Sequence, residues 1–389
     1  STEIYNKLTK QNTNRMLDDY RKCRPQFVSH LDKTNKKISL SGRPYLYTSR
    51  KDYGNLFKFF LEKTNDRFDQ SRQWSLKNLF CPIKFILNGK ELSGFFVDHH
   101  LAHSYSSATK SKIKKGLVFS SDGSGNSLLG ILASIKTGCG IFPFAHSSFR
   151  GGKFFEFSAT FLGLDCGKFM GLASYGNSNP AFIDHISLKL GTDFNKITES
   201  YFIKEYQEYF SINFSDKDLL SREIVNFAAN VQRFFELQYM KTINELNKIV
   251  INNLDNDSQG VILSGGSALN CPSNSFIAEK IGYENVFIEP SCNDEGLGFG
   301  AAMAVENMIN KVLTMEQIHS NNYQYSSPFL GPKALPVGET TVEKFSDKLF
   351  FKEITDNLWT DQVANLLINN KIGMIIRGKS EIGPRALGN

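Results

Sequence analysis

The residues best suited to chemistry lie in one short motif, Asp98-His-His-Leu-Ala-His103. His99 and His103 are four residues apart, so on one helix they share a face and can point at the same ion. Zincin proteases also use two His at this spacing, but they need Glu directly after the first, where this chain has His100. Two interpretations stay open at this point: a pair of metal ligands, or a pair of buried, hydrogen-bonded histidines.

Two carboxylates favour the metal interpretation. Asp122 follows the apolar run Gly116–Ser120, and Asp294 lies in Asn-Asp-Glu-Gly at a second expected strand end. Two imidazoles with one or two carboxylates and open positions are typical of a catalytic iron or zinc site. Each Asp alone is equally compatible with a turn or a helix N-cap. We predict a metal site of His99, His103, Asp122 and Asp294, with the first three catalytic.

Two glycine-rich loops resemble nucleotide contacts. Gly123 and Gly125 follow Asp122 and would let backbone N–H groups approach a phosphate. In Ser264-Gly-Gly-Ser-Ala-Leu-Asn270 an expected strand ends, two glycines turn and a helix starts, which suits a nucleotide's sugar and base. Either loop alone could be an ordinary turn. Followed by Gly296-Leu-Gly-Phe-Gly-Ala-Ala302, they predict the phosphate and adenosine loops of an actin-like ATPase fold. The predicted nucleotide contacts are Gly123, Gly125, Gly265, Gly266 and Asn270.

A further compact signature runs from Lys168 to Gly176. Lys168 is either a phosphate contact, which we predict, or an exposed side chain. His146 and Thr160 lie near it in the sequence, and we expect both to be ordinary structural residues.

Apolar periodicity predicts the elements that position these residues. The expected strands are Gly94–Val97, Gly116–Ser120, Leu128–Ser134, Gly260–Leu263, Asn285–Ile288 and Ile372–Ile376. The expected helices are Asn55–Thr64, His100–Thr109, 221–252, Ala268–Ile281, Ala301–Val312 and Trp359–Asn370. Residues 313–345 lack a clear period and predict a linker between two domains.

Composition limits the classes of protein. The chain has 389 residues, which suits two domains, and it has no apolar run long enough to cross a membrane. Its formal net charge of +6 is scattered, and we expect the densest run, Lys110–Lys115, to be a solvated loop rather than a nucleic-acid or phosphate patch. The 6 cysteines form no C-x-x-C pair, which predicts a reduced, cytoplasmic protein without a zinc ribbon. Ser1–Lys10 is polar and predicts no signal peptide, although the chain lacks an initiator Met.

Taken together, these motifs resemble the O-carbamoyltransferases that modify antibiotics and nodulation factors. The resemblance covers about three-quarters of the chain. The matching segments are Val97–His103, Ser121–Gly125, Lys168–Gly176, Leu263–Asn270, Asn293–Ala302 and Gly378–Asn389.

The resemblance implies an α/β protein of two parts. Residues 1–345 would form an actin-like ATPase fold of two duplicated α/β lobes, similar to the tRNA threonylcarbamoyl-transfer protein. Residues 346–389 would begin a second α/β domain that makes carbamoyl adenylate. Two departures stand out: we find no counterpart of the family's first strand with its Gly-rich turn, and the chain ends where the second domain starts.

The resemblance also implies a reaction. A carbamoyl group would pass from carbamoyl phosphate, through carbamoyl adenylate made with ATP, to a hydroxyl of a sugar or secondary metabolite. Fe(II) or another divalent metal would be held by His99, His103 and Asp294, with Asp122 a ligand or near-ligand. Gly265, Gly266 and Asn270 match the nucleotide pocket, and Arg385 lies in the motif that opens the adenylate-forming domain. We expect a small-molecule hydroxyl acceptor, no nucleic-acid or membrane partner, and leave a homodimer open.

Three alternatives remain. A tRNA threonylcarbamoyladenosine transferase shares the paired His, but it should lack the Gly-Pro-Arg-Ala-Leu-Gly of Gly383–Gly388. A sugar kinase of the same fold would need no paired His. A non-catalytic nucleotide-binding module would bind no metal.

Overall fold

The structure is a computed structural model, and it describes two compact units, Ser1–Ser326 and Ser327–Asn389. The described residues are 40–41, 80–87, 90–123, 130–137, 140–147, 151–190, 199–214, 218–254, 258–314, 327–333, 338, 343–344, 347, 359–373 and 378–387. The predicted domain boundary at residue 345 stays a prediction.

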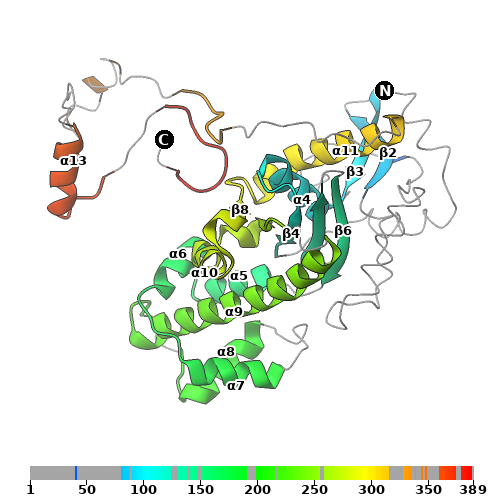
Figure 1. Cartoon of the computed structure of the whole chain (residues 1–389). Coiled ribbons are helices and arrows are strands. Elements are labelled where there is room, and N and C mark those ends of the chain that lie inside the picture. The colour runs from blue at the N-terminus through cyan, green and yellow to red at the C-terminus, as the bar shows by residue number, and fades with distance from the viewer. Residues whose placement is uncertain are drawn as a thin grey trace. The chain divides into compact units, whose positions relative to one another are not determined.

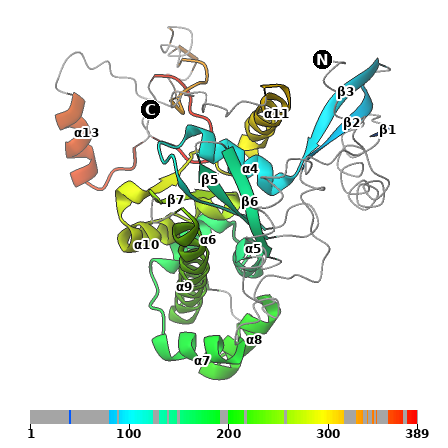
Figure 2. The same cartoon turned by 45° about the vertical axis from the view of Figure 1, so that its right-hand side comes forward.

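A five-stranded mixed sheet forms the centre of the first unit (Figures 1 and 2). Its strands are β4 (Gly116–Ser121), β5 (Ile131–Thr137), β6 (Gly140–Ser147), β7 (Val261–Ser264) and β8 (Val286–Ile288). Their order is β6-β5-β4-β7-β8, so β4 is central, antiparallel to β5 and parallel to β7. Because β4, β7 and β8 are mutually parallel, their carboxyl ends meet at one edge of the sheet, where α/β proteins bind their ligands.

Helices cover both faces of this sheet, which explains why β4 is buried along its whole length. Leu117 and Phe119 belong to one apolar cluster and Val118 to the other, because alternate side chains of a strand point to opposite faces. The Val118 side is covered by α4 (His99–Lys110) and α11 (Leu297–Thr314). The opposite side is covered by α5 (Gly151–Phe161), α6 (Cys166–Ala173) and α9 (Arg222–Asn253).

Close approach of α4 and α11 requires glycine. A Cβ atom added at Gly300 would clash with the backbone oxygen of Ala102, so only glycine lets the two helices pack this tightly. This packing fixes the helix that carries His99 and His103 against the segment that follows Asp294.

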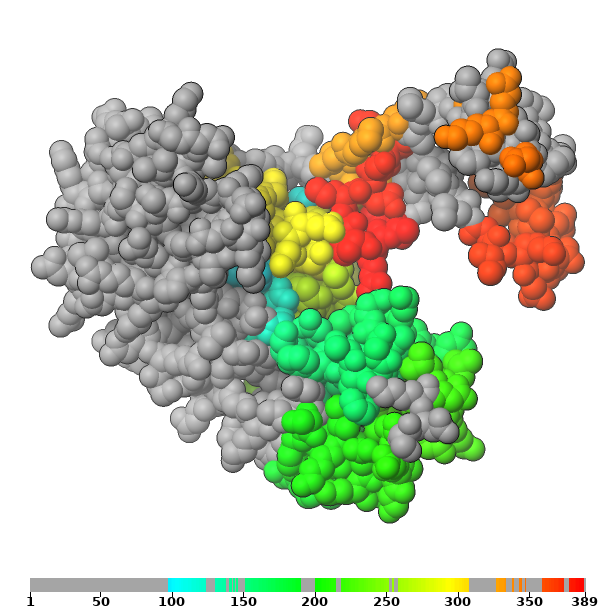
Figure 3. Space-filling view, turned by 180° about the vertical axis from the view of Figure 1, so that it is seen from behind, coloured from blue at the N-terminus to red at the C-terminus, as the bar shows by residue number. Residues whose placement is uncertain are grey.

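The long helix α9 confirms the helix predicted for residues 221–252. Its buried aromatic side chains Phe227, Phe234 and Tyr239 are the centre of the larger cluster. Ring contacts extend this cluster to Phe154 on α5 and Phe202 on α8 (Glu199–Phe210). In the view from behind, α5, α8 and α7 (Pro180–Leu190) contribute to the green part of the surface (Figure 3).

Several predicted bounds needed correction. The strand after Asp122 is Ile131–Thr137 rather than Leu128–Ser134, because the Asp122 N–H bonds Gly130 O and Ser121 pairs with Ile131. The helix predicted from Ala268 begins at Cys271 as α10 (Cys271–Ile281), after the 3-10 turn η4 (Gly266–Leu269).

The bend predicted for Asp294–Gly300 is shorter than expected. It is the 3-10 turn η6 (Asp294–Gly296), and α11 starts directly after it at Leu297 rather than at Ala301. The other short turn of this region, η5 (Tyr283–Asn285), precedes β8.

The prediction of a solvated Lys110–Lys115 run is wrong at its first residue. Lys110 is buried, and its Nζ lies 2.5 Å from Oε1 of Glu289 and 4.8 Å from the ring centroid of Phe299. The reason is that α4 continues through Lys110, which turns this side chain towards the protein interior. Lys112 and Lys114 are exposed, as expected.

A separate antiparallel sheet precedes α4. It contains β1 (Leu40–Ser41), β2 (Phe80–Leu87) and β3 (Lys90–Val97) in that order. β3 extends the predicted strand Gly94–Val97 towards the N-terminus, and the predicted helix Asn55–Thr64 lies outside the described residues. The mixed α/β class is confirmed, while the two duplicated lobes of an actin-like fold stay a prediction.

The second unit contains α13 (Trp359–Ile368), which confirms the predicted helix to within two residues of its end. A bridge between Lys333 and Lys379 joins its first and last described segments. The strand predicted for Ile372–Ile376 is not seen at Ile372 and Gly373, and its other residues lie outside the described ones. The adenylate-forming domain stays a prediction.

Candidate metal centre

The two histidines of the motif are placed by the start of α4. Asp98 caps the helix, and its Oδ1 accepts from the N–H groups of His100 and Leu101 at 2.9 and 3.1 Å. Capping at this residue places His99 in the first turn and His103 one turn later on the same face. Their Nε2 atoms lie 3.1 Å apart.

His100 faces away from this pair. It is fully buried, and its Nδ1 lies 3.1 Å from the Oγ of Ser120 on β4. The position that holds Glu in a zincin protease is therefore used here to attach α4 to the sheet.

Asp122 joins the histidines from the carboxyl end of β4. Its Oδ2 lies 3.2 Å from Nε2 of His99 and 3.1 Å from Nε2 of His103. Its Oδ1 accepts from the N–H of Gly123 at 2.6 Å, which fixes the orientation of the carboxylate.

Asp294 completes the cluster from η6, after β8. Its Oδ1 lies 3.3 Å from Nε2 of His103 and 3.7 Å from Nε2 of His99. Gly296 allows this turn to lie against α4, since a Cβ there would come within 2.6 Å of the Ser106 Oγ. The side chain of Asp294 is 70% exposed, whereas that of His103 is fully buried.

The electrostatics of the cluster favour a positive charge at its centre. Burial opposes the charged form of His103, but its hydrogen bonds to Asp122 and Asp294 outweigh burial and raise its pKa. Burial also opposes the charged form of Asp122, yet the hydrogen bonds from His103 and His99 hold its pKa well below the usual range. The hydrogen bond to His103 is the main cause of the lowered pKa of Asp294. Two ionised carboxylates thus surround the imidazole nitrogens.

The geometry fits a divalent metal ion. The four ligand atoms all lie within 4.8 Å of one another. Ligand atoms about 2.1 Å from a common ion are roughly 3.0 to 3.4 Å from their neighbours, and the contacts of His103 with His99, Asp122 and Asp294 measure 3.1, 3.1 and 3.3 Å. Two imidazoles and two carboxylates also match the chemistry of iron, zinc and similar ions.

The predicted nucleotide loop after β7 borders this cluster. Gly265 has φ of 85°, and a Cβ there would clash with the Ser121 backbone oxygen. A Cβ at Gly266 would lie 2.9 Å from the Oδ1 of Asp122. Both glycines therefore let the loop pass directly beside Asp122. Gly123 is the next residue and donates its N–H to the Oδ1 of Asp122, while Gly125 lies outside the described residues.

Comparison with known proteins gives the family of the chain. The carbamoyltransferase N-terminus family matches residues 4–303, which is most of the chain. The chain belongs to the carbamoyltransferase family. An uncharacterised protein of Methanocaldococcus jannaschii is 32% identical to this chain over 310 residues, covering 75% of this chain and 55% of that protein.

Two nodulation proteins are also similar. NolNO of Sinorhizobium fredii is 25% identical over 307 residues, covering 76% of this chain and 42% of its own length. NolO of Bradyrhizobium diazoefficiens is 26% identical over 310 residues, covering 75% of this chain and 52% of its own length. The chain spans about half the length of the curated relatives it matches. Among the helices that the structure describes, none is both long and apolar enough to cross a membrane.

For the other predicted nucleotide contacts, the structure describes the following surroundings. Asn270 is buried, caps α10 through Ser273 N–H, and exchanges two amide hydrogen bonds with Gln232. Lys168 is exposed on α6, and its Nζ lies 3.0 Å from Oδ2 of Asp165. Arg385 lies in the second unit. Their nucleotide roles stay predictions.

Sequence reasoning missed the residues that support the ligands. Ser264 donates from Oγ to the backbone oxygen of His103 at 2.7 Å and accepts from Ser107 at 2.8 Å. A Cβ at Gly152 would lie 2.6 Å from the Ser267 Oγ, so the start of α5 lies close to the same loop. The Gly-Gly pair at the beginning of α5 was the one available signal, because paired glycines often mark a close backbone approach.

Proposed function

We propose that this chain is the carbamoyl-transfer part of an O-carbamoyltransferase. It would move a carbamoyl group from carbamoyl adenylate, made from carbamoyl phosphate and ATP, to a hydroxyl of a sugar or secondary metabolite. Membership of the carbamoyltransferase family supports the group that is transferred. The observation that carries the rest is the convergence of His99, His103, Asp122 and Asp294 beside two glycine-rich turns.

The four side chains would hold Fe(II) or another divalent metal. His103 and Asp122 lie on the buried side of the cluster and would fix its position, while Asp294 lies on the exposed side. A bound divalent ion supplies Lewis-acid chemistry, polarising a carbonyl or phosphoryl oxygen.

Differences in exposure define the direction of substrate approach. The side chains of His103, His99 and Asp122 are 0%, 18% and 20% exposed, against 70% for Asp294. A substrate can therefore reach the cluster most easily past Asp294. The absent side chains at Gly265 and Gly266 leave backbone next to Asp122, where an adenylate phosphate could approach closely.

The proposed transfer forms one C–O bond and breaks another. The acceptor hydroxyl oxygen attacks the carbamoyl carbon and forms a new C–O bond. The bond from that carbon to the adenylate phosphate oxygen breaks, AMP leaves with the electron pair, and the hydroxyl proton is released. Binding beside the cluster would orient both reactants, and a divalent ion held by the four side chains would stabilise negative charge on the carbamoyl oxygen.

The test compares two Asp→Asn variants of the full chain. Asp122→Asn replaces one carboxylate ligand of the cluster by a neutral amide, whereas Asp184→Asn makes the same change at an exposed residue of α7. We expect wild type and Asp184→Asn to bind one divalent ion per chain by mass spectrometry of bound metal. Asp122→Asn should bind it at least roughly ten- to a hundredfold more weakly, since even supporting residues of metal ligands have effects of that size.

Activity is measured with supplied carbamoyl adenylate and a panel of sugars, by release of AMP and formation of the carbamate. We expect metal-dependent release from wild type and Asp184→Asn and its loss in Asp122→Asn. Equal metal binding and equal release from all three proteins would refute the role of the cluster. Tight metal binding without any metal-dependent AMP release would refute the transfer reaction.

A further inference from the structure

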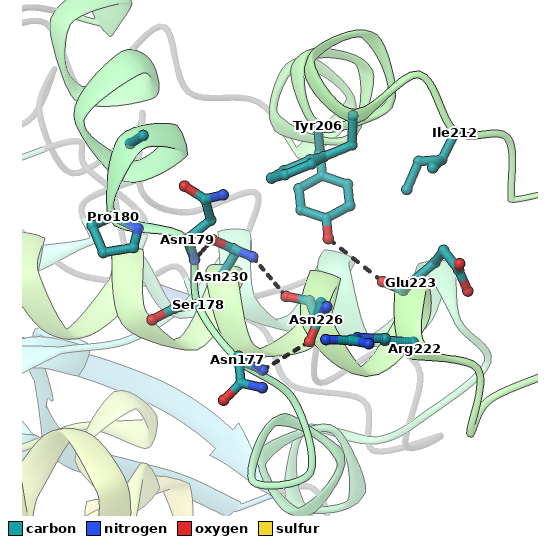
Figure 4. Close-up of a pocket in the computed structure, with 12 residues that line it drawn as sticks. Asn177, Ser178, Asn179, Pro180, Tyr206, Ile212, Arg222, Glu223, Asn226 and Asn230 are labelled. Atoms are coloured by element: carbon teal, nitrogen blue, oxygen red, sulfur yellow. Dashed lines mark hydrogen bonds between the residues drawn. The ribbon is translucent and has the colours of Figure 1, made fainter.

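A second cavity lies in the helical part of the first unit, outside the metal cluster. It is bounded by α7, α8 and the first turns of α9, and its volume is about 640 Å³ (Figure 4). Small-molecule sites have roughly 300 to 1,000 Å³, so this cavity has the volume of a ligand site. Asn226 on α9 lines this cavity. Gln232, whose side chain hydrogen-bonds Asn270, lies six residues further along the same helix, a distance of about 9 Å.

Asparagine side chains form one wall of this cavity. Asn226 and Asn230 are four residues apart on α9 and therefore share a face. The Oδ1 of Asn226 accepts from the backbone N–H of Asn177, and that of Asn230 from the N–H of Asn179, both at 2.8 Å. These two hydrogen bonds, drawn in Figure 4, hold the loop before α7 against α9. This wall of the cavity is therefore already formed in the absence of a ligand.

The signature Lys168–Gly176 ends at this loop. A Cβ at Gly176 would clash with the backbone oxygen of Val225, so only glycine allows the chain to lie directly on α9 here. The end of this signature therefore has a reason that requires no nucleotide: it shapes the loop whose next residues line the cavity.

The lining groups suit a neutral ligand that carries many hydroxyls. The amide nitrogen of Asn226 and the guanidinium of Arg222 are donors, and the carboxylate of Glu223 is an acceptor. The charges of Arg222 and Glu223 are opposite and adjacent, so the wall has no net charge. Phe210 and Ile212 are partly exposed and supply apolar surface, where the less polar face of a sugar ring can pack. Tyr206 is buried, and its hydroxyl points to the Glu223 backbone oxygen at 3.5 Å.

We propose that this cavity is a saccharide-binding site for one or two neutral sugar rings, separate from the metal cluster. Binding there needs neither a metal nor carbamoyl transfer, so the inference does not depend on the proposed function.

The test uses saturation-transfer NMR of the full chain with glucose, galactose, mannose, N-acetylglucosamine and maltose as probes. Asn226→Asp keeps the oxygen that accepts from Asn177 N–H and removes the amide donor; Asn244→Asp makes the same change at an exposed residue of the same helix. We expect at least one probe to bind wild type and Asn244→Asp equally. Asn226→Asp should bind it roughly five- to tenfold more weakly, which corresponds to one hydrogen bond.

A second pair separates a sugar from an anion. Arg222→Gln removes the cation from the cavity, and Lys248→Gln removes an exposed cation from the far part of α9. We expect Arg222→Gln to weaken sugar binding less than tenfold and Lys248→Gln to leave it unchanged. Failure of all five sugars to bind, or equal binding by Asn226→Asp and wild type, would overturn the proposal. Binding of inorganic phosphate that depends on Arg222 and excludes the sugars would also overturn it. Asp122→Asn should bind the sugar like wild type, so loss of transfer and loss of this site are distinguishable.

Discussion

Replacing Asp98 by Asn should make the metal-free protein more stable at neutral pH. Asp98 caps α4 directly before the metal ligands, and its side chain is almost completely buried. Burial is the main cause that raises its pKa from 3.8 to about 6, although the N–H of Leu101 partly opposes this. Asn presents the same cap oxygen without a charge, and the two residues are about equally good N-caps.

The magnitude follows from the pKa difference between the folded and unfolded states. A shift from 3.8 to about 6 is about 2 units, and each unit corresponds to 1.36 kcal/mol, so the ionised carboxylate costs roughly 3 kcal/mol at pH 7.5. An acid with a raised folded pKa binds more protons when folded, so its contribution to stability declines as pH rises from about 4 to about 6. Near pH 4.5 the cost is roughly 1 kcal/mol. We expect Asp98→Asn to gain up to about 3 kcal/mol at pH 7.5 and about 1 kcal/mol at pH 4.5. The pKa of about 6 already includes the attraction of Asp98 to His99 and His103.

The assay is thermal unfolding of chelator-treated protein at pH 4.5 and 7.5, followed by circular dichroism. The matched control is Asp165→Asn, which changes the exposed N-cap of α6. The hydrogen bond from the Lys168 N–H is the largest cause that lowers the pKa of Asp165, so the control should not gain stability at neutral pH. A lower midpoint for Asp98→Asn at pH 7.5, or an equal gain at both pH values, would refute the argument that the buried charge dominates.

Three further predictions concern the cluster and its support. The affinity of the site for a divalent metal should fall as pH is lowered through the raised pKa of His103, because the imidazole must lose its proton to bind the metal. Calorimetry in buffers of different ionisation enthalpy measures the proton that is released on binding. Lys110→Met should lower the free energy of unfolding in urea by about 3 to 5 kcal/mol, because it leaves the buried Glu289 without its cation. Adding Glu289→Gln should recover most of this loss, and a double variant whose loss equals the sum of the two single losses would contradict the prediction. Gly300→Ala should lower the unfolding midpoint and weaken metal binding, because the new Cβ separates α11 from Ala102 on α4; unchanged values for both would show that the helices relax without cost.

Most helices and strands and all four candidate ligands could be predicted without coordinates. Apolar periodicity was sufficient for α9, because the 3.6-residue repeat of its apolar side chains reflects which face is buried. A continuous apolar run predicted β4, and an Ala- and Ser-rich segment predicted α4. The four-residue spacing of His99 and His103 likewise depends only on helix geometry. The ends of elements were less predictable, as at α10, because a cap such as Asn270 and a 3-10 turn compete over a few residues.

Contacts between residues that are distant in the sequence required the folded structure. Asp122 and Asp294 are far apart in the sequence, and they reach the histidines because β4 and β8 are parallel strands of one sheet and end at the same edge. Lys110 shows the same limit: its sequence neighbours are exposed lysines, but its partner Glu289 comes from another strand end. Such pairing depends on strand order and helix packing. These are selected by the burial of apolar surface between distant segments, and local residue spacing does not encode them.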